Sequence, residues 1–298
     1  MTSFYLEPRS ARALVAYLPG RKAGHHPGKI MATNLWTDVE ALDRLARSAR
    51  TAEPRRGGPA LPGDRPGAEA PPLLPRFLGD GFAVAASERP ARLVSGDLVD
   101  AFPVSDREIA VVIGDVSGKG TPAGVMAAFV RSIVRHVAPL GASPGDTLER
   151  VNRILCGARL DAMYVTLFLG TLDLGNGLFR YASGGHPPAL RRAPGEAAIP
   201  FGSATGPVLG LLDRRRFDTG AVVLRPGEVV VMTTDGVTEA ERADGEFFGL
   251  VRLAGVLDGV EPLSAGGALA AIEAGLEAFE RDGRRDDATL LALQLAVA

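Results

Sequence analysis

The sequence predicts an α+β domain in which mainly antiparallel β-sheets are covered by helices. Short strands follow one another in pairs around turn residues, and amphipathic helices come in pairs between these groups of strands. Repeated strand–helix–strand units, which would indicate a parallel sheet, are not evident. Together these observations favour hairpin-built sheets over a doubly wound fold.

The strands are recognised by alternating apolar residues bounded by turn signals. They are expected at residues 81–87, 98–104, 108–113, 164–173, 177–182, 221–224, 228–233 and 289–296. Successive members are expected to pair as hairpins around turns at 105–107, 175–177 and 226–227.

The helices are recognised by apolar residues at helical spacing. One is expected over 122–138 with Thr121 as its cap, and a second begins at Ser143-Pro144 with Asp146 three residues after the cap. Two more are expected over 249–257 and 265–281. The first carries a continuous apolar stripe of Val125, Met126, Phe129, Val130, Ile133, Val134 and Val137.

Composition divides the chain into three parts. Residues 51–76 hold seven prolines and four glycines and are expected to be a flexible linker. Residues 1–50 before it are expected to be a tether or a segment that binds a regulatory partner, with one helix over 37–50. The dense segment 77–298 is expected to be the folded domain.

Charge and cysteine content exclude several classes of protein. The formal net charge of -2 gives no general attraction to nucleic acid or anionic lipid, and neither is expected as a partner. The single cysteine, Cys156, excludes an internal disulfide framework. No apolar run approaches the roughly 20 residues of a membrane helix. We therefore expect a cytoplasmic protein.

Four aspartates stand where strands are expected to end: Asp97, Asp115, Asp235 and Asp286. Asp97 and Asp115 lie equally far from Asp106 in the hairpin turn, so both should lie at the open end of that hairpin. Two carboxylates held that close repel each other unless a cation or a proton lies between them. Spacing alone leaves open that these are solvated turn residues.

Six short motifs that occur in a fixed order along the chain resemble those of a known family. They are Ser95-Gly96-Asp97-Leu98-Val99-Asp100, Gly114-Asp115-Val116-Ser117-Gly118-Lys119-Gly120, Ala182-Ser183-Gly184-Gly185-His186-Pro187-Pro188, Gly206-Pro207-Val208-Leu209-Gly210, Thr233-Thr234-Asp235-Gly236-Val237-Thr238-Glu239 and Asp286-Asp287-Ala288-Thr289. From about residue 73 to 298, the chain resembles the stage II sporulation protein E-like branch of the metal-dependent (PPM-type) serine/threonine protein phosphatases. The resemblance implies an αββα sandwich of two antiparallel sheets flanked by helices.

The resemblance also implies the site. It assigns Asp97, Asp115, Asp235 and Asp286 as carboxylates that bind two Mn²⁺ or Mg²⁺ ions, with the Val116 carbonyl as a further ligand. Asp287 is the alternative to Asp286. Carboxylate and carbonyl oxygens suit these ions, whereas zinc or copper would favour His or Cys. Such a pair of ions activates water for attack on phosphorus, so no nucleophilic Ser or Cys is needed.

The family commonly acts on phosphoserine of anti-sigma-factor antagonists in bacterial partner-switching pathways, and we carry this over as an expectation. Three departures are visible: Ser95 replaces a usual glycine, Leu98-Val99 replaces the aromatic residue that follows the aspartate in the usual motif, and Lys119 stands where histidine is common. His186 is expected to be structural. A non-catalytic module with the same fold and a small-molecule phosphatase remain alternatives. A nucleotide-binding loop is disfavoured because Gly114 and Gly118 are separated by three residues rather than four.

Overall fold

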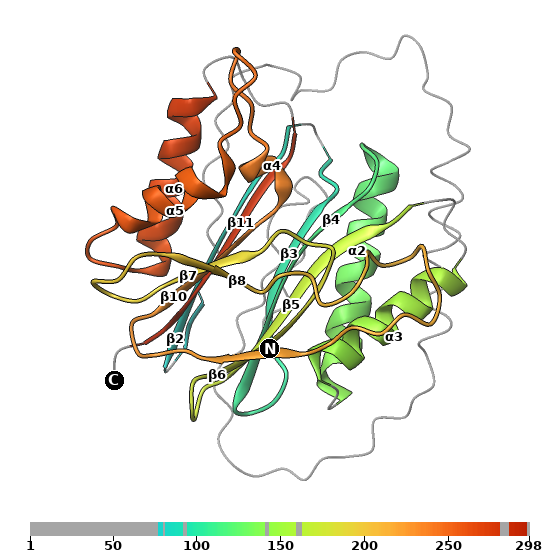
Figure 1. Cartoon of the computed structure of the whole chain (residues 1–298). Coiled ribbons are helices and arrows are strands. Elements are labelled where there is room, and N and C mark those ends of the chain that lie inside the picture. Colours follow the sequence, from blue (N-terminus) through green and yellow to red (C-terminus); the bar gives the residue numbers. More distant parts are fainter. Residues whose placement is uncertain are drawn as a thin grey trace, which may run out of the picture.

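The computed structural model describes residues 77–79, 81–91, 94–140, 143–158, 163–280 and 286–296. The predicted N-terminal segment (1–50) and linker (51–76) lie outside these residues. The described part is an α+β sandwich of two antiparallel sheets between two layers of helices, as expected (Figure 1).

One sheet has five strands in the order β3-β4-β5-β6-β9, and every neighbouring pair is antiparallel. These strands are β3 (Asp97–Pro103), β4 (Glu108–Val116), β5 (Val165–Asp173), β6 (Leu178–Gly184) and β9 (Gly220–Val223). The predicted hairpins β3–β4 and β5–β6 are both present, because each pair of strands is joined by a turn of only four residues, 104–107 and 174–177.

The other sheet has six strands in the order β1-β2-β11-β10-β7-β8, again antiparallel throughout. Its strands are β1 (Phe77–Gly79), β2 (Phe82–Arg89), β11 (Ala288–Leu295), β10 (Val229–Thr233), β7 (Ala189–Arg192) and β8 (Ile199–Phe201). The C-terminal strand β11 lies in the middle of this sheet, between β2 and β10. Strands β1, β7 and β8 were not predicted, because three or four residues carry little alternation.

The inner faces of the two sheets pack against each other. Val84 and Leu291 from the six-stranded sheet and Ile113 and Phe168 from the five-stranded sheet are buried in one cluster. Because both faces of each sheet are covered, the central strands are almost continuously buried: all five residues of β10 are buried.

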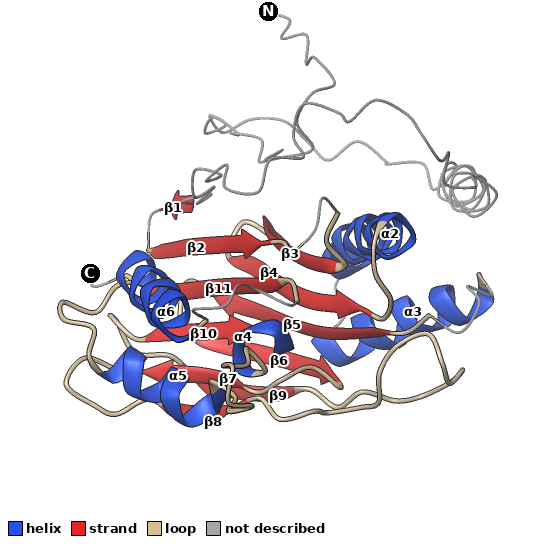
Figure 2. Ribbon diagram, turned by 90° about the horizontal axis from the view of Figure 1, so that it is seen from above, coloured by secondary structure: helices blue, strands red, loops and turns tan. Residues whose placement is uncertain are grey.

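Helices cover the outer faces, and Figure 2 shows the two pairs on opposite sides of the strands. Helices α2 (Thr121–Val137) and α3 (Pro144–Gly157) pack on the five-stranded sheet, and α5 (Gly249–Asp258) and α6 (Ala265–Phe279) pack on the six-stranded sheet. A 3-10 turn, η1 (Ala138–Leu140), follows α2, and the short helix α4 (Asp235–Thr238) follows β10. Six residues of the predicted stripe on α2 are buried, and Val125 is half-buried.

Two details of the predicted fold are wrong. Strands β9 and β10 do not pair around the turn at 226–227: β9 pairs with β6 in one sheet, and β10 pairs with β7 and β11 in the other. This turn therefore carries the chain from one sheet to the other. The residue that caps α2 is Gly120, not Thr121, and no side chain bonds to that helix end.

One described helix, Thr121–Leu140, is long and apolar enough by length and composition to span a membrane. Half of it is buried inside the protein, where α2 packs on β3 and β4. The apolar face of this helix therefore packs against the protein core.

Candidate functional site

The open end of the β3–β4 hairpin brings two of the predicted aspartates together. Asp97 and Asp115 are direct Cα partners in the antiparallel register, as the spacing about Asp106 predicts. The Val116 N–H donates to the Gly96 carbonyl oxygen at 3.2 Å, which closes this end of the hairpin. A Cβ added at Gly96 would lie 3.0 Å from the Val116 carbonyl oxygen, so a side chain there would press against the backbone of β4.

The six-stranded sheet supplies the opposite wall of the site. The Thr234 hydroxyl, at the end of β10, donates to Asp97 Oδ2 at 2.9 Å and accepts from the Thr289 N–H at 3.0 Å. Asp235 follows at once as the first residue of α4. This chain of hydrogen bonds ties the two sheets together beside the predicted ligands.

Asp286 and Asp287 are placed differently. The Asp287 carboxylate accepts hydrogen bonds from the backbone N–H groups of Ala91 at 2.7 Å and Gly96 at 3.1 Å. The Asp286 carboxylate is exposed, and its contact to a charged partner is the Lys119 ammonium at 3.4 Å. Asp287 therefore holds the loop that leads to Asp97, which leaves Asp286 as the member of the pair that faces outward.

The loop that carries Asp235 and the loop that carries Asp286 and Asp287 approach each other closely at Gly236. A Cβ at this position would lie 1.8 Å from the Asp287 carbonyl oxygen, a distance that no side chain can take. The turn after Asp235 thus packs directly against the backbone of the Asp286-Asp287 pair, and glycine is required by this contact.

The aspartates are close enough to alter one another's acidity. Burial raises the pKa of Asp97 to about 8, and the charge of Asp115 adds to this effect, although the neighbouring hydroxyl groups of Thr289 and Thr234 act in the opposite sense. Burial raises the pKa of Asp115 to about 6, and the charges of Asp235 and Asp286 add to it. Burial, together with the charge of Asp286, also raises the pKa of Asp235. Such mutual repulsion indicates one acidic cluster built from both sheets.

The cluster fits hard divalent cations in its chemistry. Asp97 Oδ1 is buried without a hydrogen-bond partner, and the surrounding donors are carboxylate and carbonyl oxygens, which Mg²⁺ and Mn²⁺ favour. As the side chains stand, no group of three or more His, Cys, Asp or Glu among the described residues is arranged to hold a metal. Thr234 bonds to Asp97 Oδ2 and leaves Oδ1 available, whereas the Asp286 carboxylate lies 3.4 Å from the Lys119 ammonium.

The other reactive side chains in the described part are placed as structural groups. His186 is buried, its Nδ1 lies 3.0 Å from the Thr166 hydroxyl, and burial lowers its pKa to about 3. Thr166 is the β5 partner of Asp115, so His186 packs behind the site as a neutral residue. Burial raises the pKa of Cys156, and its thiol donates to Asn152 Oδ1 at 3.7 Å on the same helix. Neither is poised as a nucleophile.

Sequence reasoning missed the role of three polar residues. Thr234, Thr289 and Asp287 connect the loops that carry the predicted ligands. All three stand inside the recognised motifs, yet their roles depend on contacts between segments far apart in the sequence.

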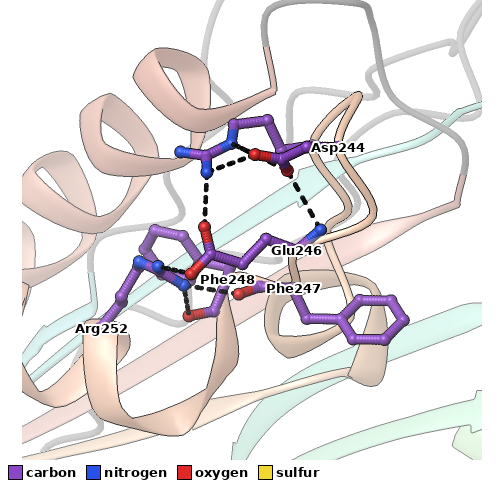
Figure 3. Close-up of polar contacts among 6 residues, drawn as sticks. Asp244, Glu246, Phe247, Phe248 and Arg252 are labelled. Atoms are coloured by element: carbon purple, nitrogen blue, oxygen red, sulfur yellow. Dashed lines mark hydrogen bonds and ion pairs between the residues drawn. The ribbon is translucent and has the colours of Figure 1, made fainter.

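A tight hairpin over residues 240–248 joins α4 to α5, shortly after Asp235 in the chain. The Phe248 N–H donates to the Ala240 carbonyl oxygen at 2.8 Å, and Glu246 forms ion pairs with Arg242 and Arg252. Figure 3 shows Arg252 contacting Glu246 and the backbone carbonyl oxygens of Phe247 and Phe248. These contacts fix the segment that follows Asp235.

Comparison with protein families and curated proteins gives consistent matches. The family model described as Stage II sporulation protein E (SpoIIE) matches residues 105–296. Protein IcfG of Synechocystis sp. is 35% identical over 211 residues, covering 61% of this chain and 33% of that protein. Phosphoserine phosphatase RsbU of Bacillus subtilis is 29% identical over 170 residues, covering 56% of this chain and 49% of that protein. The chain thus matches a third to a half of the length of these relatives.

Solved structures share the fold. The RsbU and RsbW domains of Rv1364c from Mycobacterium tuberculosis match with a TM-score of 0.63 and 27% identity, over 76% of this chain and 61% of that chain. The PP2C phosphatase domain of SpoIIE from Bacillus subtilis matches with a TM-score of 0.65 and 18% identity, over 72% of this chain and 63% of that one. The SiaA-PP2C domain of Pseudomonas aeruginosa matches with a TM-score of 0.64 and 20% identity, over 89% of this chain and all of that one.

Proposed function

From the premise that this chain belongs to the stage II sporulation protein E (SpoIIE) family, we propose that it is a metal-dependent phosphatase for phosphoserine and phosphothreonine in proteins. The observation that carries this proposal is the acidic cluster formed where both sheets end. Asp97 and Asp115 come from one sheet, and Asp235 and Asp286 stand at the ends of strands of the other. The name of the relative RsbU, a phosphoserine phosphatase, supports the substrate class.

In this proposal, Asp97, Asp115, Asp235 and Asp286, with the Val116 carbonyl, hold two Mn²⁺ or Mg²⁺ ions. When bound, such ions supply positive charge that lowers the pKa of water and neutralises phosphoryl oxygens. The chain's own contribution is to hold the carboxylates in place. Thr234 orients Asp97, and Asp287 fixes the backbone of the preceding loop. Lys119, half-exposed beside Asp286, adds a cation at the edge of the acidic cluster, to which a phosphate can be drawn.

The protein substrate proposed is an anti-sigma-factor antagonist phosphorylated on serine, within a partner-switching pathway. This is supported by similarity to RsbU and to a structure in which RsbU and RsbW domains occur together. We further propose, from the sequence, that residues 1–50 bind a regulatory partner and that the protein acts in the cytoplasm.

The test is hydrolysis of p-nitrophenyl phosphate with Mn²⁺, Mg²⁺ or EDTA, comparing wild type with Asp115→Asn and Asp235→Asn. We expect activity that requires metal and falls at least a hundredfold in both variants, because each removes a charge from the cluster. Asp106→Asn is the matched control, since Asp106 is exposed at the opposite end of the same hairpin. Full activity in either cluster variant would overturn the site.

A second comparison separates the two adjacent aspartates. Asp286→Asn should abolish activity with little change in thermal stability, because its side chain is exposed. Asp287→Ala should lower stability by about 1–3 kcal/mol, because two backbone N–H groups lose their acceptor. If Asp287→Ala kept its stability but lost metal affinity, the assignment of the two residues would be reversed.

The same assay addresses the alternatives left open by the sequence. A non-catalytic module would hydrolyse neither p-nitrophenyl phosphate nor phosphoproteins with any metal. A small-molecule phosphatase would hydrolyse p-nitrophenyl phosphate but not a phosphoserine protein. Activity on both supports the proposed function.

A further inference from the structure

The loop between β8 and β9 carries an exposed cationic segment that the proposed site does not use. Residues 211–216 are all exposed, whereas Leu209 before them and Phe217 after them are buried. The segment contains Leu211 and Leu212, each nearly half exposed, followed by Asp213 and three consecutive arginines. We call residues 211–216 the arginine loop.

The arginine loop is held firmly at both ends against α3. The buried Asn152 side chain accepts from the Gly210 N–H and donates to the Leu212 carbonyl oxygen, each at 2.9 Å. At the other end, the Gly145 N–H donates to the Thr219 hydroxyl at 2.9 Å. Figure 1 shows the chain between β8 and β9 running beside α3. The loop therefore presents its side chains from a fixed backbone.

Its positive charge is only partly neutralised. Arg214 forms an exposed ion pair with Asp213 at 3.6 Å. Arg215 and Arg216 make no hydrogen bond or ion pair with any residue that the structure describes. The next acidic residue, Asp218, lies beyond the buried Phe217. Within the described part of the chain, two guanidinium groups thus face solvent without a partner, beside two exposed leucines.

The loop begins close to the acidic cluster. Leu209 pairs with Val165 through backbone hydrogen bonds of 3.0 and 2.8 Å, and Val165 is the β5 partner of Val116. Neighbouring strands lie about 4.8 Å apart, so Leu209 is about 10 Å from Val116. Seven further residues, 210–216, add at most about 25 Å. A folded protein of ordinary size, with a radius of gyration of about 13 Å, can contact both the loop and the site.

We propose that the arginine loop is a docking surface for the acidic face of the phosphoprotein substrate, with Leu211 and Leu212 contacting apolar residues beside it. This rests on the proposed phosphatase function and deepens it. Guanidinium groups pair well with carboxylates and phosphates, and a phosphorylated acidic protein supplies both. A small ester such as p-nitrophenyl phosphate is too short to span from the acidic cluster to the loop. The loop therefore selects protein substrates without taking part in the reaction.

The test compares wild type with Arg215→Ala/Arg216→Ala on two probes, p-nitrophenyl phosphate and phosphorylated casein, an acidic phosphoprotein. We expect kcat/KM on phosphocasein to fall about fivefold to tenfold through KM, since exposed charge pairs contribute modestly to binding and two of them are lost. The rate on p-nitrophenyl phosphate should stay within about twofold of wild type. The salt dependence of phosphocasein hydrolysis should also weaken in the variant.

Arg107→Glu is the matched control, because it changes the net charge by the same amount at the far end of the β3–β4 hairpin. Thermal melting of each variant checks that the fold is intact. An equal effect of the control and the loop variant, or equal loss on both probes, would overturn the docking surface and leave the phosphatase function standing.

A binding measurement in EDTA makes the inference independent of turnover. Wild type should bind immobilised phosphocasein at least threefold more tightly than Arg215→Ala/Arg216→Ala, even if the protein proves not to be a phosphatase. No difference would refute the docking surface. Binding to phosphatidylserine vesicles that needs these arginines, with no effect on phosphocasein, would assign the loop to a membrane and refute it as well.

Discussion

Replacing Asp97 by asparagine should remove activity and at the same time stabilise the metal-free protein at pH 8. Asp97 is only 7% exposed, one of its oxygens has no hydrogen-bond partner, and its neighbours Asp115 and Asp287 are also acidic. Asparagine keeps an oxygen to accept from Thr234 but carries no charge at any pH. It therefore removes the repulsion and leaves the principal hydrogen bond in place.

The magnitude follows from the pKa of Asp97, which rises from 3.8 to about 8 on folding. Between these values the native state binds more protons than the unfolded state, so stability falls as pH rises through that window. Roughly 4 pH units at about 1.4 kcal/mol each set a ceiling of about 6 kcal/mol. Because Asp115 shares the proton and the new amide needs a partner of its own, we expect a gain of about 2 kcal/mol at pH 8.

The assay is thermal unfolding in EDTA at pH 5 and pH 8. A gain of about 2 kcal/mol corresponds to a rise in Tm of about 4–8 °C for a domain of this size. At pH 5 the gain should be much smaller, because Asp97 is already protonated in the native state. Mn²⁺ should raise the Tm of wild type more than that of the variant. A variant that melts lower at pH 8, or a gain that is equal at both pH values, would refute the reasoning.

Two further predictions concern the scaffold. Gly236→Ala should lower stability by about 1–3 kcal/mol and reduce activity, because its Cβ would lie 1.8 Å from the Asp287 carbonyl oxygen; chemical denaturation measures this. Gly157→Ala, where a Cβ meets nothing within 4 Å, is the control and should be neutral or slightly stabilising. Ser143→Ala should cost about 1 kcal/mol by removing the capping box with Asp146, while p-nitrophenyl phosphate activity stays near wild type. An unchanged Tm in the last variant would contradict the cap's contribution.

Local patterns were sufficient to predict much of the fold. The turn centred on Asp106 set the register of the β3–β4 hairpin and paired Asp97 with Asp115, because an antiparallel register follows from the position of a short turn. The capping box at Ser143 and the apolar stripe on α2 were likewise local signals. Pairing of β9 with β10 was wrong, because a proline–glycine turn indicates a change of direction and not which sheet the next strand joins.

By itself, the sequence determined the hairpins, the long helices and the candidate aspartates, since these depend on spacing along the chain and on residue chemistry. Only the tertiary structure decided how β10 and β11 bring Asp235 and Asp286 to the pair on β3 and β4, and that Asp287 binds backbone N–H groups instead of facing outward. It also decided that the arginine loop lies against α3 within reach of the acidic cluster. The physical reason is that these contacts join segments up to about two hundred residues apart, and their geometry is set by the packing of the two sheets.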